Sequence, residues 1–178
     1  LSFNTPVLHD GGYDLSADDG SLAFWKQILP ERTVHYTAKD GSRQQIDFTK
    51  DYLEGLASAS AVDSLGFLLA DKDNAHTMDP ERLRGTVAKM EYRGDVEKPG
   101  LYGKIVFPSR EAASAVLANP ALGVSARIRP NVRRDDGSTI PAGIIHVLGT
   151  LDPQVQGMSP WQATDLSSTD EVLDLTHE

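Results

Sequence analysis

The sequence has no cysteine among its 178 residues, and it has no long apolar run. The absence of cysteine excludes a disulfide framework and a thiolate metal site, and it fits a reducing compartment. A membrane-spanning helix needs about 20 consecutive apolar residues, so we expect no insertion into a membrane. The chain begins at Leu1 with neither an initiator Met nor a signal-peptide pattern, and we expect a trimmed piece of a longer product.

Basic side chains are also scarce. The chain carries 17 Lys and Arg against 26 Asp and Glu, which gives a formal net charge of −9. Nucleic-acid binding needs clustered basic residues that neutralise phosphates, so this balance argues against a nucleic-acid partner. The composition of the whole chain, 39% hydrophobic and 24% charged, is that of an ordinary globular domain with a core of its own.

The chain divides into three regions by composition. Residues 1–21 are rich in Gly, Asp and Ser and are interpreted as a loose lead-in. Residues 22–164 are interpreted as one domain. Residues 165–178 form an acidic tail, which we expect to be a linker toward a scaffold region missing from this chain.

Local patterns within the domain predict mostly short strands. Asp40-Gly41 lies between two extended runs and predicts a hairpin over residues 32–48, and Thr49 is predicted to N-cap a helix that ends near Ser60. Further strands are predicted at 64–70, from after Pro80 to Tyr92, at 100–107, at 121–130 and at 142–151, with a second helix over 110–119. Such an order is typical of a mainly β fold with surrounding helices (α+β), in an antiparallel sheet or barrel, rather than a doubly wound parallel sheet.

A single serine stands in the middle of the strand predicted for "ALGVSARIRP", residues 121–130. An extended backbone places Val124, Ala126 and Ile128 on one face and Ser125 on the other. Ser125 is therefore a candidate nucleophile. The alternative is a small polar residue on the half-exposed face of an ordinary strand.

A serine hydroxyl needs a base to take its proton, and histidine, with a pKa near ~6.5, suits that task at neutral pH. His76 lies in the polar loop "DKDNAHTMDP" and His146 in the apolar strand "AGIIHVLGTL". The alternatives are a solvated loop histidine for His76 and a core histidine with satisfied hydrogen bonds for His146. Arg127 and Arg129 share the predicted face of Ser125 and are candidates for lining a site, or else plain solvated arginines.

Three segments carry a family resemblance. In this order, "DNAHTMDPERLRGTV", "NPALGVSARIRP" and "AGIIHVLGTLDPQVQGMSPWQATDLS" resemble the capsid maturation (prohead) proteases of tailed phages, especially phages of actinobacteria. With "WKQILPERTVHY", the similarity extends from about residue 24 to residue 167. That family resembles the herpesvirus assemblins, serine proteases with a closed β-barrel ringed by helices and a Ser-His-His triad. The resemblance implies a closed antiparallel β-barrel for this chain.

The resemblance also assigns roles to the candidate residues. It implies that His76 is the general base, Ser125 the nucleophile and His146 the third member of the triad. Many phage relatives hold an acidic residue at the third position, and Asp152 is the alternative third member. No metal or organic cofactor is needed.

The resemblance further implies partners and a location. The expected substrates are the phage scaffold protein or scaffold domain, the removable segment of the major capsid protein, and the protease itself. The expected location is the host cytoplasm, inside the assembling procapsid. A homodimer is a candidate assembly, with no nucleic-acid or membrane partner.

Two other functions remain open from the residues. One is a non-catalytic scaffold or capsid-binding module with the same fold, which would lack the nucleophile or the base. The other is a hydrolase of small esters with the same triad. Neither the G-x-S-x-G elbow nor the order Ser, acid, His is found, which disfavours the α/β-hydrolase version of that second function.

Overall fold

The computed structural model describes most of the chain between residues 20 and 164. The described residues are 20–59, 65–70, 79–133, 136–153 and 155–164. They form the strands β1 (Leu22–Pro30), β2 (Thr33–Thr37), β3 (Arg43–Asp47), β4 (Leu65–Leu69), β5 (Leu83–Arg93), β6 (Gly100–Phe107), β7 (Gly123–Arg133), β8 (Thr139–Thr150) and β9 (Gln162–Thr164), the helices α1 (Lys50–Ala59) and α2 (Ser114–Ala118), and the short 3₁₀ helix η2 (Pro80–Arg82).

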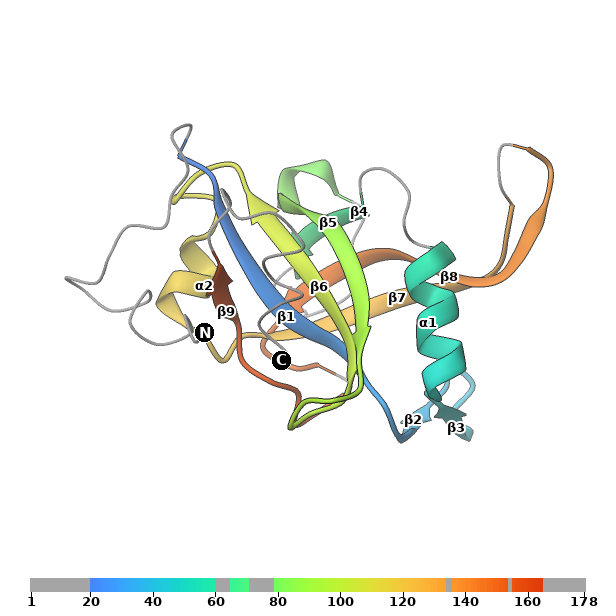
Figure 1. The fold of residues 1–178 in the computed structure, drawn as a ribbon. Coiled ribbons are helices and arrows are strands. Elements are labelled where there is room, and N and C mark those ends of the chain that lie inside the picture. The colour runs from blue at the N-terminus through green and yellow to red at the C-terminus, as the bar shows by residue number, and fades with distance from the viewer. Residues whose placement is uncertain (1–19, 60–64, 71–78, 134–135, 154, 165–178) are drawn as a thin grey trace.

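Seven of these strands form one mixed sheet in the order β7-β8-β4-β5-β6-β1-β9 (Figure 1). Strands β4 and β8 pair in parallel, and every other neighbouring pair in this sheet is antiparallel. Strands β2 and β3 form a separate antiparallel hairpin. None of the helices in the described residues is long and apolar enough to cross a membrane.

The prediction of a closed antiparallel β-barrel, like that of the herpesvirus proteases, was wrong. The end strands of the sheet are β7 and β9, and within the described residues no ladder joins them. The fully buried Trp161 lies at this junction: its Nε1 donates to the Leu122 carbonyl at 2.8 Å and its backbone N–H to the Pro120 carbonyl at 3.3 Å. A side chain therefore bridges the start of β7 and the start of β9 in place of a ladder.

The prediction of surrounding helices also needs correction. In the described residues the second helix is only five residues long, Ser114–Ala118, and it is preceded by a turn in which Ser109 Oγ accepts from the Ala112 N–H at 3.1 Å. The sheet thus dominates the fold. Helix α1 packs beside β8, β5 and β6 and covers part of the sheet, with Leu53 and Leu56 buried (Figure 1).

The predicted hairpin and first helix are confirmed. Strands β2 and β3 pair from Thr33–Asp47 to Thr37–Arg43, and Gly41 at the tip has a φ of 85°, which glycine adopts without a steric penalty. Thr49 Oγ1 accepts from the Tyr52 N–H at 3.2 Å, which is the expected N-cap bond.

Strand β1 was not predicted, and its burial explains why. All nine of its residues are buried, so no alternation of apolar and polar residues marks it as a strand. Phe24 of β1 packs edge to face against Phe107 and Trp161, which lie with Phe67 in the core, at ring-centroid distances of 5.7 and 6.0 Å. Such aromatic pairs add to the stability that apolar burial supplies.

Candidate active site on strands β7 and β8

Ser125 lies near the start of β7, where the predicted alternation of faces is confirmed. Val124 is fully buried in the core, and Ala126 and Ile128 pack against that core. Ser125 lies between two of these residues and is half-buried. Its side chain therefore belongs to the face of the sheet that is turned away from the core.

His146 of β8 lies on the same face as Ser125. In the antiparallel ladder, Ser125 is opposite Leu148 and Arg127 is opposite His146. Residues directly opposite each other point to the same face, so Ser125 and His146 are diagonal neighbours, a relation with a typical separation of about 7–8 Å. The structure brings two of the three predicted triad residues together on adjacent strands.

A β-bulge next to His146 sets its direction. Arg127 pairs with His146 but Ile128 pairs with Ile144, so Ile145 is an extra residue in β8. Ile144 and Val147 both belong to the core although they are three positions apart, which a regular strand does not allow. The bulge therefore keeps both of these side chains in the core while His146 points to the opposite face.

His146 is only 1% exposed, and by register its side chain lies on the same face as that of Ser125. On its other side it pairs with Gly66 of β4. A Cβ built at Gly66 would lie 3.0 Å from Leu83 Cδ1 and 3.3 Å from Leu68 Cδ1, so a larger residue here would need these leucine side chains to shift slightly. The imidazole is buried on the Ser125 face of the sheet rather than among the core side chains.

His76, the predicted base, lies outside the described residues. The described residue before its segment is attached to β8: the Ala70 N–H donates to the Gly149 carbonyl at 2.9 Å. Arg82 Nε donates to the Leu69 carbonyl at 3.1 Å, and its Nη2 also donates to the Ala70 carbonyl. Ala70, the last described residue before this segment, is therefore bonded to the β8 residue that follows Leu148, the partner of Ser125.

The remaining predicted site residues are all exposed. Arg127 is opposite His146 and shares its face, and Arg129 is opposite Gly143. Asp152, the alternative third member, follows the end of β8, and its N–H donates to Thr150 Oγ1 at 3.1 Å. By register, His146 is nearer to Ser125 along the β7–β8 ladder than Asp152 is.

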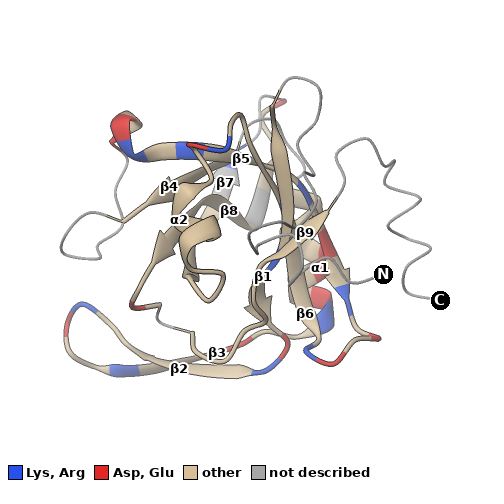
Figure 2. Ribbon diagram, turned by 90° about the vertical axis from the view of Figure 1, so that its left-hand side faces the viewer, with Lys and Arg blue, Asp and Glu red and all other residues tan. Residues whose placement is uncertain are grey.

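An apolar pocket of about 560 Å³ adjoins Ser125, and the sequence did not predict it. The β2–β3 hairpin and β7 contribute most of its lining, and single residues or pairs from β1, α1, β8 and the segment after β8 complete it. Figure 2 shows this hairpin at the bottom of the view, apart from the strands of the main sheet. In the sequence, Val34 and Tyr36 alternate with polar residues of the hairpin, which indicates one apolar face. This alternation was the pattern from which part of the pocket lining could have been predicted.

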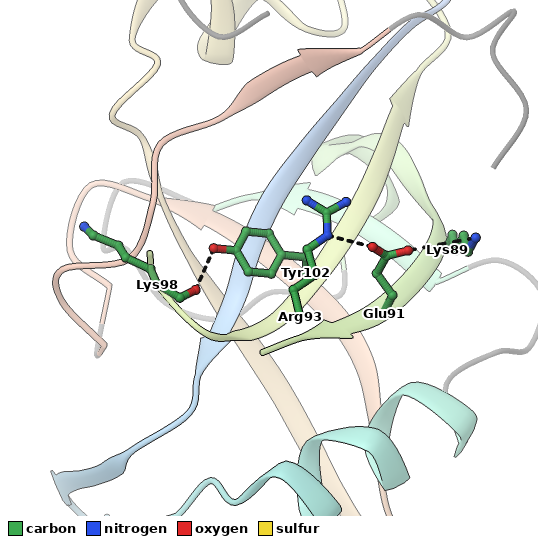
Figure 3. Close-up of polar contacts among 5 residues, drawn as sticks. All are labelled: Lys89, Glu91, Arg93, Lys98 and Tyr102. Atoms are coloured by element: carbon green, nitrogen blue, oxygen red, sulfur yellow. Dashed lines mark hydrogen bonds and ion pairs between the residues drawn. The ribbon is translucent and has the colours of Figure 1, made fainter. Parts of the chain in front are cut away.

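A second polar group lies on β5 and β6, away from Ser125 (Figure 3). Arg93 Nε donates to Glu91 Oε2 at 2.6 Å, and the guanidinium carbon lies 4.3 Å from the Trp25 ring centroid and 4.9 Å from that of Tyr102. The Tyr102 hydroxyl donates to the Lys98 carbonyl at 2.7 Å. These contacts fix the end of the β5–β6 hairpin.

Lys26 is the most unusual titratable group among the described residues. It is 3% exposed, and its Nζ donates to the carbonyls of Ser159 and Gln27. Burial, and secondarily the charge of Lys98, lowers the pKa of Lys26 to about 8. Gln27 holds the same loop, because its Oε1 accepts from the Ser159 N–H at 2.9 Å. Both side chains attach the chain after β8 to β1.

No group of three or more His, Asp or Glu side chains in the described part of the chain is placed to hold a metal ion. No family model matches this sequence, and no curated protein matches it. The function is therefore inferred from the geometry of the site together with the resemblance of its motifs.

Proposed function

We propose that this protein is a serine endopeptidase that processes scaffold and capsid protein, and itself, during phage procapsid maturation. The observation that carries the proposal is the placement of Ser125 and His146 on one face of two adjacent strands. A catalytic serine needs an imidazole system beside it, and such groups commonly come from distant parts of a chain. The β-bulge in β8 supports the same conclusion, since bulges are frequent next to active sites.

The proposed reaction is acyl transfer from a peptide to Ser125. His76 takes the proton of the Ser125 hydroxyl as Oγ attacks the peptide carbonyl, and the resulting imidazolium protonates the leaving amine. Water then hydrolyses the acyl-enzyme, with His76 again acting as the base. His146 holds His76 in the productive orientation and stabilises its positive charge.

The topology is compatible with this role for His76. It follows Ala70 by six positions, and an extended chain of that length reaches about 20 Å. Strand β4 runs parallel to β8 and ends at Leu69. Leu69 pairs with Gly149, the residue that follows Leu148 in β8. A chain of six residues from Ala70 is thus long enough for the proposed base to act on the Ser125 hydroxyl.

The family resemblance supplies the proposed biological setting. The substrates are the phage scaffold, the removable segment of the major capsid protein and the protease itself. The reaction takes place in the host cytoplasm within the assembling procapsid. The catalytic cycle written above uses only side chains of the protein and water.

The first test is to incubate the protein with its scaffold and capsid partners and to identify the cleaved peptides by mass spectrometry. Ser125→Ala should lower the cleavage rate by at least about a thousandfold, since triad residues act as a unit. His76→Ala should be nearly as inactive. Ser138→Ala, which changes a serine in the exposed turn between β7 and β8, should cleave like the parent.

The parent and Ser125→Ala should have similar thermal melts, because the substitution removes one hydroxyl from a small side chain. Cleavage by Ser125→Ala at the parent rate would remove this serine from the mechanism. A parent protein that binds the scaffold and cleaves nothing would instead indicate the non-catalytic assembly module.

A further inference from the structure

The apolar pocket beside Ser125 is lined by residues of β7 and of the β2–β3 hairpin. Val124, Ser125 and Ala126 all line it, although their side chains alternate between the two faces of the sheet. A space at the edge of a strand meets side chains of both faces, so this lining fits a pocket that reaches the edge of β7. Ile28 and Leu29 of β1 and Ala142 of β8 line it as well. Among the described strands, β7 pairs with β8 alone, so its other edge is not part of a ladder.

The wall opposite β7 is the inner face of the β2–β3 hairpin. Val34 and Ile46 are cross-strand partners and line the pocket, and Tyr36, on the same face as Val34, lines it as well. The outer face of the hairpin is polar and exposed, with His35 paired to Gln45. The hairpin is amphipathic, and its apolar side is turned toward the edge of β7.

The chemistry of the pocket restricts its occupant. Among the described residues that line it, none carries a charge at neutral pH, and burial raises the pKa of the Tyr52 hydroxyl. A charged side chain would lose its hydration there without gaining an ionic partner. The volume of about 560 Å³ falls within the range of ~300–1,000 Å³ typical of ligand pockets.

We infer that the β2–β3 hairpin and the free edge of β7 together form a substrate subsite for an extended peptide with a bulky apolar side chain close to the cleaved bond. The inference rests on the proposed function, because it places the occupant next to Ser125. A peptide added to a free strand edge gains main-chain hydrogen bonds, and pockets beside that edge select its side chains. The hairpin residues Ile46 and Tyr36 are specificity residues.

The test is a cleavage-site profile on a proteome-derived peptide library, read by mass spectrometry, for the parent and two charge variants. The parent should cleave peptides with Leu, Ile, Met or Phe at one fixed position near the bond. Ile46→Asp should lower kcat/KM for those peptides at least about tenfold and raise it for peptides with Lys or Arg at that position. Gln45→Asp adds the same charge on the outer face and should keep the parent profile.

A second variant guards against misfolding of Ile46→Asp. Tyr36 is 40% exposed at the mouth of the pocket, so Tyr36→Ala leaves the core intact. It should raise KM for the preferred peptides several-fold with little change in kcat, because it removes binding area away from the reacting atoms. His35→Ala is the matched control on the outer face and should keep the parent KM.

Labelling with a fluorophosphonate probe separates this inference from the proposed function. The probe tests the reactivity of Ser125 and should label the parent and all four hairpin variants equally, but not Ser125→Ala. Two results would overturn the subsite alone, provided that all these proteins are labelled equally. One is a parent with no preference for apolar side chains, and the other is the same cleavage profile in Ile46→Asp and Gln45→Asp. A parent that is neither labelled nor active would overturn the proposed function and the subsite with it.

Discussion

Ser125 and His146 differ in what surrounds them. Ser125 is half-buried on an edge strand, while His146 is 1% exposed on an inner strand of the sheet. A nucleophile must be reached by a peptide, whereas a residue that orients the base needs no access to solvent. The difference in burial therefore agrees with the two roles proposed for them.

The role of His146 can be separated from that of His76 by substitution. His146→Ala should keep more activity than His76→Ala, because an orienting residue is less essential than the base itself. His146→Glu should exceed His146→Ala, since a carboxylate can accept the same hydrogen bond from the imidazole and favours its charged form. The measurement is kcat/KM on a cleaved peptide.

Thermal melts must accompany these rates, because a carboxylate buried at this position lowers stability unless it is paired. If both His146 variants melt like the parent and lose the same activity, His146 is a structural histidine. Asp152→Ala would then identify the alternative third member.

Lys26 predicts a pH dependence of stability. Its pKa is lowered from 10.5 to about 8 in the folded protein, so above pH 8 the unfolded chain holds a proton that the folded chain has released. The free energy of unfolding should therefore rise from pH 8 toward 10.5, by at most about 1.4 kcal/mol per pH unit. Below pH 8 the Lys26 side chain is protonated in both the folded and the unfolded state, so the full cost of burying its charge lowers the free energy of unfolding.

Urea unfolding at pH 7.5, 8.5 and 9.5 measures this rise while staying below the titration of the tyrosines. Lys26→Met should lack the rise, and Lys39→Met, at an exposed position in the β2–β3 turn, should retain it. An equal pH slope in the parent and Lys26→Met would show that another group causes the dependence.

At the scale of elements, the junction between β7 and β9 depends on one indole. Trp161 Nε1 donates to the Leu122 carbonyl at 2.8 Å, whereas the buried Nε1 of Trp25 has no hydrogen-bond partner among the described residues. Trp161→Phe removes both apolar volume and a buried hydrogen bond, and should lower the free energy of unfolding by about 2–4 kcal/mol. Trp25→Phe also removes volume and weakens the contact with the Arg93 guanidinium, but it breaks no hydrogen bond of Nε1 to another described residue.

The two tryptophan variants form a matched pair, because the chain contains only these two tryptophans. Chemical denaturation should show a clearly smaller loss of stability for Trp25→Phe than for Trp161→Phe. Equal losses would mean that the Leu122 hydrogen bond contributes nothing measurable to the junction.

At the scale of the whole molecule, an open sheet and a closed barrel predict different hydrogen exchange. In a closed barrel every strand amide is paired, but here alternate amides of β7 face the free edge. We expect these alternate amides to exchange quickly, while the amides of β4, β5 and β6 exchange only on global unfolding. The β2–β3 hairpin, with its mostly exposed residues, should also exchange quickly.

Residue-resolved hydrogen exchange by NMR measures this pattern in the apo protein. Slow exchange at every amide of β7 would contradict a free edge. It would also remove the space for an added peptide strand, so the same experiment bears on the substrate subsite.

The sequence by itself determined the local structure at several points. Asp40-Gly41 specified a hairpin, Thr49 capped a helix, and alternation around Ser125 set its face, because turns, caps and the two-residue period of a strand depend on neighbouring residues. The motifs also predicted the candidate residues Ser125 and His146, which the structure brings to one face of the sheet.

Only the tertiary structure decided the long-range features. The parallel pairing of β4 with β8 joins segments about 80 residues apart, and strand β1 is buried on both faces, so neither leaves a local pattern. The bulge at Ile145 shifts the period of β8 in the middle of an apolar run, where the sequence shows no change of pattern. The sheet would be closed only if β7 and β9 were paired. At that junction the bulk and the hydrogen bond of Trp161 take the place of a ladder.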